Sequence, residues 1–327
     1  MHSLNQAEIS VVIPVKNEAG KIKDCIDGIL SQTIPVKEII VIDSGSTDGT
    51  LDILRAYQQV KVIEIPGSEF NHGTTRNLGV KHATGDYVLL TVGDARAYDN
   101  NFIEHMLTTI KSDNNIVAVC GSQVVPHDSD KNPAEWFRPV SQPKVTKYSF
   151  SVEAYNALTP MEKRRACGWD DVIAMYKKEV LEKIPFRHTT YAEDALWAQD
   201  ALLAGYTIAY NPAARVYHYH LEDPDFSFKK NYTVQYHFYK FFGLIYDKPQ
   251  ISFKGYLRLA KILMKAEGIS LSERLKWWRY NISMIEGSIK ANEAVKNAIS
   301  KGDEFFDKEH SELCGMPPVP KKTIAVG

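Results

Sequence analysis

The stretch ISVVIPVKNE, from Ile9 to Glu18, decides what kind of fold this chain can form. It begins with a short apolar run, Ile9–Val15, which is typical of a strand buried on both faces of a sheet. Polar residues follow at once, so this strand delivers Glu18 to its carboxyl end. Two further runs, Glu38–Asp43 and Val60–Glu64, have the character of strands as well.

Helical patterns separate these strands. Apolar residues recur at helical spacing over 19–31, and further helices are predicted from Ser46 and over Thr74–Ala83. A fourth strand, Tyr87–Thr91, comes next. Strands that alternate with helices and are apolar through their length predict a mostly parallel sheet with helices on both faces. In such sheets, ligands bind beyond the carboxyl ends of the strands.

The composition suits a soluble globular protein. The chain has 327 residues, a formal net charge of -1 and 44% hydrophobic residues. No apolar run approaches the roughly 18 residues that span a bilayer, and the first residues do not have the pattern of a signal peptide. The four cysteines lie far apart and form no C-x-x-C pair, which argues against a zinc site or a disulfide framework. We therefore expect reduced thiols and a cytoplasmic location.

Charge is distributed unevenly along the chain. Residues 1–225 carry 22 Lys/Arg and 30 Asp/Glu, whereas residues 226–290 carry 12 Lys/Arg and 4 Asp/Glu. The second stretch also has many aromatic residues in a helical pattern. We therefore predict two regions with different partners, one at 1–225 and a basic, aromatic-rich helical region at 226–327.

Three interpretations of the helical region stay open. Its aromatic residues can form the core of a helical subdomain, which is the simplest interpretation. Its basic residues can rest on an anionic membrane, which adds a peripheral location at the inner face of the membrane. Nucleic-acid binding ranks last, because no nucleic-acid motif accompanies the charge. The candidates for membrane contact are Arg258, Lys261, Lys265, Arg274, Lys276 and Arg279.

The loops after the strands carry acids rather than a known phosphate-binding motif. No G-x-G-x-x-G follows the first strand, and no G-x-x-x-x-G-K-[ST] occurs in the chain, which argues against dinucleotide dehydrogenases and P-loop enzymes. We interpret Asp43 as a ligand-binding acid, because it ends the second strand, and Ser46 and Asp48 as caps of the next helix. Asp94 follows the fourth strand beside Gly93. It is either a metal ligand or the polar cap of a turn, since hard cations usually take several oxygen ligands.

Several motifs follow one another along the chain: VVIPVKNE at 11–18, VIDSGSTDGT at 41–50, FNHGTTRNLG at 70–79, GDA at 93–95, YAED at 191–194 and VYHYH at 216–220. Taken in this order, they resemble family 2 glycosyltransferases. Each is weak alone, and their shared order over roughly residues 8–225 argues against coincidence. The third motif resembles the bacterial rhamnosyltransferase branch in particular.

The resemblance implies that residues 1–225 form a catalytic domain with a GT-A fold, which is a Rossmann-like sheet that binds a nucleotide-sugar. It implies an inverting glycosyltransferase that moves a sugar to a glycan or lipid-linked acceptor, with dTDP-L-rhamnose as donor and a bacterial surface or exported glycan as product. Transfer of another hexose from UDP or GDP is an alternative. A catalytically silent nucleotide-sugar-binding protein is a second alternative, because Gly93 stands where the family usually carries the first acid or glutamine of a pair.

The resemblance also assigns the residues that hold the donor. The strand-end residues line the nucleoside pocket, and Arg76 lies near the diphosphate, where a guanidinium fits an anion well. Two alternatives stay open: Arg76 is a solvated helix residue or the partner of a nearby acid, and Asn71 caps its helix. The nucleotide-sugar-binding residues are Pro14, Val15, Glu18, Asp43, Arg76 and Asp94.

For the metal, the resemblance makes Asp94 a ligand of Mn²⁺ or Mg²⁺. The diphosphate and water molecules supply most of the remaining oxygens. We expect a further ligand from His218 or His220, because residues i and i+2 of a strand share one face, and imidazole suits Mn²⁺ better than Mg²⁺. We take His218 as the ligand.

For catalysis, the resemblance makes Asp194 the general base, and Glu193 holds the acceptor or orients that base. The helix dipole favours a carboxylate at a helix N-terminus, so we expect Asp194 to be deprotonated at neutral pH. The alternative is that both are ordinary first-turn acids. Trp197 is an acceptor platform or part of the core. The acids at 170 and 171 are interpreted as surface-loop residues.

Overall fold

The computed structural model describes residues 7–137, 143–249, 252–317 and 319. By compactness, the chain divides into two units, one of residues 1–124 and 140–218 and the other of residues 125–139 and 219–327. The boundary predicted after residue 225 marks the end of the expected catalytic domain. The division into compact units does not test it, so this boundary stays a prediction.

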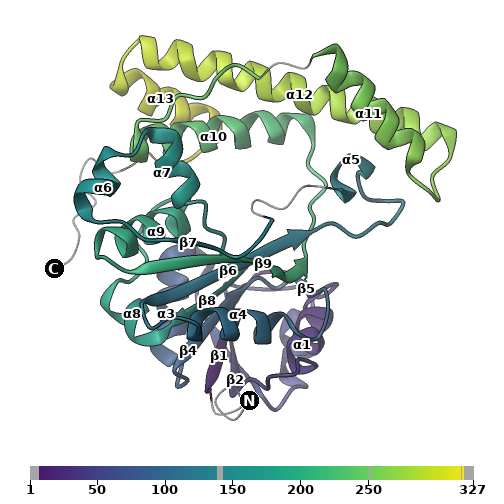
Figure 1. Ribbon diagram of the computed structural model, residues 1–327. Helices are drawn as coiled ribbons and strands as arrows, with labels where there is room; N and C mark the ends of the chain where they lie inside the picture. The colour runs from purple at the N-terminus through teal and green to yellow at the C-terminus, as the bar shows by residue number, and fades with distance from the viewer. Residues whose placement is uncertain (1–6, 138–142, 250–251, 318, 320–327) are drawn as a thin grey trace. The chain divides into compact units, whose positions relative to one another are not determined.

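The first unit is built on a mixed sheet, drawn as arrows in Figure 1. The four strands predicted from the N-terminal third are confirmed at their predicted bounds. The described strands are β1 (Ile9–Val15), β2 (Glu38–Asp43), β3 (Val60–Glu64), β4 (Tyr87–Thr91), β5 (Arg96–Ala97), β6 (Ile116–Val124), β7 (Thr146–Tyr148), β8 (Ile173–Lys177) and β9 (Thr207–Tyr217).

The order of the strands brings several strand ends to one edge. The order is β3-β2-β1-β4-β8-β6-β9-β5, with β7 paired to β9. Parallel ladders join β3, β2, β1 and β4, and another joins β6 and β9. Because β8 runs antiparallel to both β4 and β6, the strands β6 and β9 point the same way as β1, β2 and β4. The carboxyl ends of these five strands therefore share one edge, and the loop that leads into β8 lies there too.

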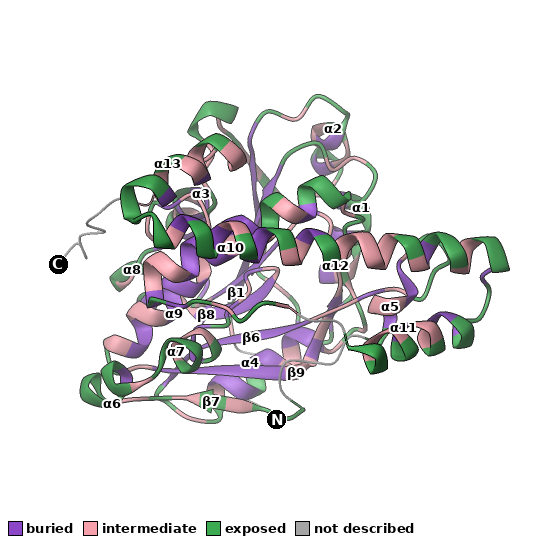
Figure 2. Ribbon diagram, turned by 90° about the horizontal axis from the view of Figure 1, so that it is seen from above, coloured by how far each residue is buried: buried purple, intermediate pink, exposed green. Residues whose placement is uncertain are grey.

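Helices cover both faces of this sheet, as predicted. On one face, α1 (Ile22–Leu30) and α4 (Phe102–Lys111) share a buried core with the odd-numbered residues of β1. On the other face, α3 (His72–His82) lies very close to β1, because a Cβ at Gly79 would stand 2.2 Å from Val12 Cγ1. Figure 2 shows much of the sheet as buried. The remaining helices of this unit are α2 (Thr50–Arg55), η1 (Gly67–Glu69), α6 (Val152–Ala157), α7 (Pro160–Ala166), α8 (Lys178–Lys183) and α9 (Glu193–Leu203).

The second unit is helical. Its helices are α5 (Pro133–Trp136), α10 (Pro224–Phe242), α11 (Phe253–Lys265), α12 (Leu271–Ser300) and α13 (Asp303–Cys314). One core joins α10, α12 and α13 around the buried rings of Tyr232, Tyr236 and Phe306. The interpretation of the aromatic residues as core is confirmed for these rings. No helix within the described ranges is both long enough and apolar enough to cross a membrane.

Candidate functional site

The carboxyl edge of the sheet holds a carboxylate and an imidazole that face each other. Asp94 follows β4 and His218 follows β9, and Asp94 Oδ1 lies 3.4 Å from His218 Nε2. Both side chains are largely buried. Lys21 Nζ lies 3.2 Å from Asp94 Oδ2 and balances its charge.

These donors fit a divalent cation, because carboxylate oxygen and imidazole nitrogen together suit Mn²⁺. The argument that led to His218 is nevertheless wrong. It placed His218 and His220 on one face of a strand, whereas β9 ends at Tyr217 and both histidines follow it. Residue alternation therefore says nothing about where their rings point, and His218 as a ligand stays a prediction.

A hydrogen-bonded chain sets the orientation of His218. Its Nδ1 lies 2.7 Å from Oε1 of Gln123, which is in β6, and Gln123 Nε2 donates to Asp170 Oδ2. A carboxylate only accepts hydrogen bonds, so Asp170 fixes which end of the Gln123 amide faces His218. The amide oxygen then accepts from Nδ1–H, which turns Nε2 toward Asp94. The sequence did not single out Gln123, because a glutamine inside a strand carries no motif.

Packing explains the glycine beside Asp94. A Cβ at Gly93 would lie 2.9 Å from Val15 Cγ1 and 3.2 Å from Glu18 Cγ. A larger residue at this position would therefore push β1 and its following loop away. Burial, followed by the charge of Asp94, raises the pKa of Glu18, which places that carboxyl group in the same electrostatic environment as Asp94.

Asp43 is almost fully buried and holds the turn that follows β2. Its Oδ1 accepts hydrogen bonds from the backbone N–H groups of Gly45 and Ser46, both at 2.9 Å, and Ser46 Oγ donates to its Oδ2. Pro14 and Val15 are buried within β1. Ligand binding by these residues stays a prediction.

The interpretation of Ser46 as a helix cap is wrong. The N-cap of α2 is Gly49, which makes no side-chain cap, and Ser46 Oγ accepts from Asn17 N at 2.8 Å. Asp48 accepts from Thr50 N at the start of α2, at 3.1 Å, and also from Ala19 N at 3.0 Å. Both side chains therefore tie the loop after β2 to the loop after β1.

A buried cluster of charges lies at the start of α9. The guanidinium of Arg76, on α3, donates to Glu193 Oε1, and its Nε lies 3.5 Å from Asp171 Oδ2. Arg76 is 5% exposed, Asp171 1% and Glu193 7%. Arg76 is thus a partner of nearby acids, as one alternative held, and its contact with a diphosphate stays a prediction. Asn71 caps α3, because its Oδ1 accepts from Thr74 N at 3.2 Å.

The cluster holds more carboxyl groups than cations, and this changes their acidity. Burial raises the pKa of Asp194 well above its ordinary range, and the charges of Glu193, Asp171 and Asp170 raise it further. Burial likewise raises the pKa of Asp171 to about 6, against the opposing effect of Arg76. The helix-dipole argument predicted an easily ionised Asp194. It is wrong in direction, because desolvation and neighbouring acids outweigh the dipole.

Three further residues near α9 differ in how well the sequence predicted them. Asp171 is buried and accepts from the Tyr176 hydroxyl, so its interpretation as a surface-loop residue is wrong. Trp197 is fully buried against Tyr176, which confirms core packing. Ala192, just before Glu193, has a φ of +57°, a left-handed conformation that is strained for alanine. Such strain often accompanies functional positions, and no sequence pattern announced it.

Two curated proteins are similar in sequence to this chain over most of its length. A family model described as glycosyl transferase family 2 matches residues 10–184. The O-antigen chain rhamnosyltransferase RfbN of Salmonella typhimurium is 32% identical over 242 residues, which cover 72% of this chain and 70% of the relative. The O-antigen chain rhamnosyltransferase WbaN of Salmonella anatum is 30% identical over 242 residues, which cover 71% and 70%.

Solved structures share the fold. The mannosyltransferase PcManGT from Pyrobaculum calidifontis, solved with GDP-Man and Mn²⁺, has a TM-score of 0.51 at 18% identity over 91% of this chain and 76% of that one. TarS 1–349 of S. aureus has a TM-score of 0.51 at 16% identity over 89% and 91%. The predicted GT-A fold is confirmed.

Proposed function

Because this chain belongs to glycosyl transferase family 2, it is a glycosyltransferase, and we propose that it transfers L-rhamnose with inversion from a nucleoside-diphosphate sugar. The acceptor is a hydroxyl group of a glycan or a lipid-linked oligosaccharide, and the product is part of a bacterial surface polysaccharide. The observation that carries this proposal is the similarity to two O-antigen chain rhamnosyltransferases over 70% of their lengths. The location is cytoplasmic.

The donor is held at the carboxyl edge of the sheet. Pro14, Val15, Glu18 and Asp43 line the nucleoside pocket at the ends of β1 and β2. Asp94 and His218 hold Mn²⁺ or Mg²⁺, and the 3.4 Å between their oxygen and nitrogen atoms supports this assignment. When bound, the cation supplies positive charge that stabilises the diphosphate as it leaves. The neighbour that was solved with GDP-Man and Mn²⁺ supports a metal of this kind.

Asp194 acts as the general base. Its carboxylate accepts the proton of the acceptor hydroxyl, and the acceptor oxygen forms a bond to the anomeric carbon of the sugar. The bond from that carbon to the diphosphate oxygen breaks, and its electron pair leaves on the nucleoside diphosphate. A carboxylate whose pKa is raised accepts a proton more readily than an ordinary aspartate, so the raised pKa of Asp194 supports this role.

Glu193 and Arg76 position this base. Their buried ion pair fixes the first turn of α9 against α3, which holds the Asp194 backbone in place.

The loss of activity at low pH arises from Asp194. Because the carboxylate is the active form, activity falls as the pH drops through its raised pKa.

A transfer assay tests the proposal. The full chain is incubated with Mn²⁺, a lipid-linked oligosaccharide extract and one donor at a time: dTDP-L-rhamnose, UDP-glucose or GDP-mannose. We expect release of dTDP and, by NMR, a new linkage of inverted anomeric configuration. Turnover of only the UDP or GDP sugar would overturn rhamnose as the substrate, and a retained configuration would overturn the base mechanism.

A further inference from the structure

The hairpin of α11 and α12 exposes an unusual amount of apolar surface. Five side chains, which we call the α11–α12 apolar face, are at least half exposed: Phe253 76%, Leu257 53%, Met264 68%, Leu271 79% and Leu275 50%. On α11 they follow at spacings of four and seven residues, so they share one side of the helix. That side is separate from the one that carries Leu259 and Leu263 into the core.

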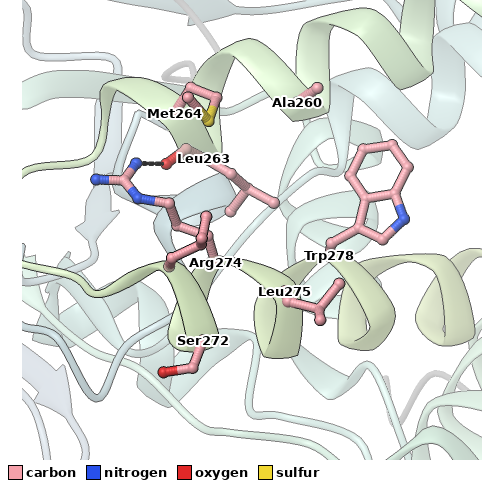
Figure 3. A pocket seen from close by; sticks show the side chains of 8 residues that line it. Ala260, Leu263, Met264, Ser272, Arg274, Leu275 and Trp278 are labelled. Carbon is pink, nitrogen blue, oxygen red and sulfur yellow. Dashed lines mark hydrogen bonds between the residues drawn. The ribbon is translucent and has the colours of Figure 1, made fainter.

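An open apolar hollow adjoins this face. It has a volume of about 600 Å³ and is lined by Ala260, Leu263, Met264, Leu271, Ser272, Arg274, Leu275 and Trp278. Figure 3 shows how α11 supplies one wall and α12 the other. Its lining is almost wholly apolar although it opens to the outside. Exposed apolar surface of this kind marks a site where a protein, a membrane or an apolar ligand binds.

Basic residues border the apolar face on α11. Lys254, Arg258 and Lys265 each follow directly after one of its exposed residues, so they lie about 100° around the helix from the apolar face. Lys261 lies on the same side of α11, and we call these four residues the basic stripe. All four side chains are exposed. Arg274 is different, because its guanidinium donates to the backbone oxygens of Leu263 and Ala266. It therefore joins α12 to α11 and is left out of the basic stripe.

Charge selects the partner. Residues 253–279 hold seven Lys/Arg and two acidic residues. A second copy of this chain, docking through the same surface, would bring like charges together. An anionic lipid surface offers the complementary charge together with an apolar interior.

We infer that the α11–α12 apolar face inserts into the interface of an anionic bilayer, with the basic stripe at the level of the lipid headgroups. The apolar side chains supply burial, and the Lys and Arg side chains reach along the surface to the phosphates. This inference does not rest on the proposed transfer of rhamnose, because vesicle binding needs neither donor nor acceptor.

Flotation of the full chain with lipid vesicles tests the inference. Vesicles of phosphatidylcholine with phosphatidylglycerol are compared with vesicles of phosphatidylcholine alone, at about 0.1 M and about 1 M salt. We expect binding to the anionic vesicles that weakens at high salt. Combining Phe253→Ser, Leu257→Ser and Leu271→Ser should weaken it roughly tenfold or more. Combining Arg258→Gln, Lys261→Gln and Lys265→Gln should weaken it by roughly a hundredfold.

Matched variants serve as controls. Leu221→Ser with Ile245→Ser removes two other exposed apolar residues of the same unit, and Lys301→Gln with Lys308→Gln removes two other lysines; both variants should float like the wild type. The inference is overturned if the wild type ignores anionic vesicles, or if the apolar variant floats unchanged. It is also overturned if the wild type is a dimer by light scattering that the apolar variant dissociates, which would make a second copy the partner. Nucleotide binding, measured in parallel, shows whether the variants remain folded.

Discussion

Asp194 lies in the first turn of α9, next to Glu193, whose charge is paired with Arg76. Two effects compete at this carboxyl group. The helix dipole favours the anion by at most about 2 kcal/mol, whereas desolvation and three neighbouring carboxyl groups disfavour it. The second effect wins, which leaves a base whose pKa is raised well above that of an ordinary aspartate. Residue type and position alone gave no sign of this, because the carboxyl groups meet only in the folded chain.

The Asp194→Asn variant distinguishes a role in the transfer step from a role in nucleotide binding. The amide keeps the shape of the side chain but cannot accept the proton, so we expect transfer to fall roughly a hundredfold to ten-thousandfold. Binding of nucleotide should change by no more than a few-fold, as measured by calorimetry. Asp52→Asn, at a side chain that is 84% exposed, is the control and should retain full turnover. Undiminished transfer by Asp194→Asn would remove this residue from the mechanism.

A substitution of Gly93 tests whether the position beside Asp94 simply lacks an acidic residue or has no room for one. We expect Gly93→Asp to destabilise the protein by about 1–3 kcal/mol in denaturant unfolding, because its Cβ would collide with Val15. Its affinity for Mn²⁺ should not rise.

Gly20→Asp is the matched control, because a Cβ at Gly20 would meet no atom within 4 Å. Its stability should stay within about 0.5 kcal/mol of the wild type. A Gly93→Asp variant that is as stable as the wild type and binds Mn²⁺ more tightly would show that the acid is simply missing.

At the scale of elements, the parts that the sequence predicted are those set by local pattern. The strands β1 to β4 follow from apolar runs that end in polar residues, and their parallel order follows from the helices between them. The antiparallel insertion of β8 follows from pairing between distant segments, which no local pattern records. That insertion brings the loop with Asp170 and Asp171 to the edge where Gln123 and His218 lie, so the network around His218 could not be read from sequence.

Gln123 connects these elements, and its removal tests the connection. We expect Gln123→Ala to lower the affinity for Mn²⁺ by roughly ten- to a hundredfold, because His218 loses the partner that fixes its ring. Calorimetric titration of Mn²⁺ measures the change without any turnover. Gln58→Ala, at an exposed position of the same unit, should bind like the wild type. Equal affinity in the two variants would mean that Gln123 does not position the ligand.

Packing between α10 and α13 buries two histidines. His310 and His237 are fully buried, and the His310 ring stacks on Tyr236 with 3.9 Å between ring centroids. Burial lowers the pKa of each histidine from 6.5 to about 4. Between these two pKa values, the histidines of the unfolded chain are therefore protonated, whereas those of the folded chain are neutral. Stability is lost as the pH falls through this window, by at most about 1.4 kcal/mol per pH unit for each histidine.

His310→Phe should reduce this pH dependence. The phenyl ring keeps the stacking on Tyr236 and cannot titrate, and neither ring nitrogen of His310 has a hydrogen-bond partner among the described residues. We expect a smaller fall in Tm between about pH 7 and pH 5 than in the wild type. The exposed His188 provides the control, since His188→Gln should keep the wild-type slope. If the slope of His310→Phe also matches the wild type, the acid sensitivity arises elsewhere.

At the scale of the whole molecule, the chain combines two kinds of chemistry. Its first unit gathers acids, a histidine and an arginine, to which we assign the handling of a nucleotide-sugar as a proposal. Its helical unit carries an excess of basic residues beside exposed apolar side chains. The uneven distribution of charge predicted two regions with a boundary after residue 225, and that boundary stays a prediction. The sequence did not reveal the α11–α12 apolar face, because exposed and core-facing leucines look the same in a sequence.

Calorimetric titration of dTDP, UDP and GDP into the full chain, with and without Mn²⁺, tests the central claim most directly. We predict that dTDP binds more tightly than UDP or GDP, and that removing Mn²⁺ weakens its binding at least roughly tenfold, because the proposed cation at Asp94 would supply positive charge to the diphosphate. Asp94→Ala should remove this dependence on metal. Binding of dTDP that ignores Mn²⁺, or no binding of any of the three nucleotides, would contradict a metal-assisted nucleotide-sugar site at the carboxyl edge of the sheet.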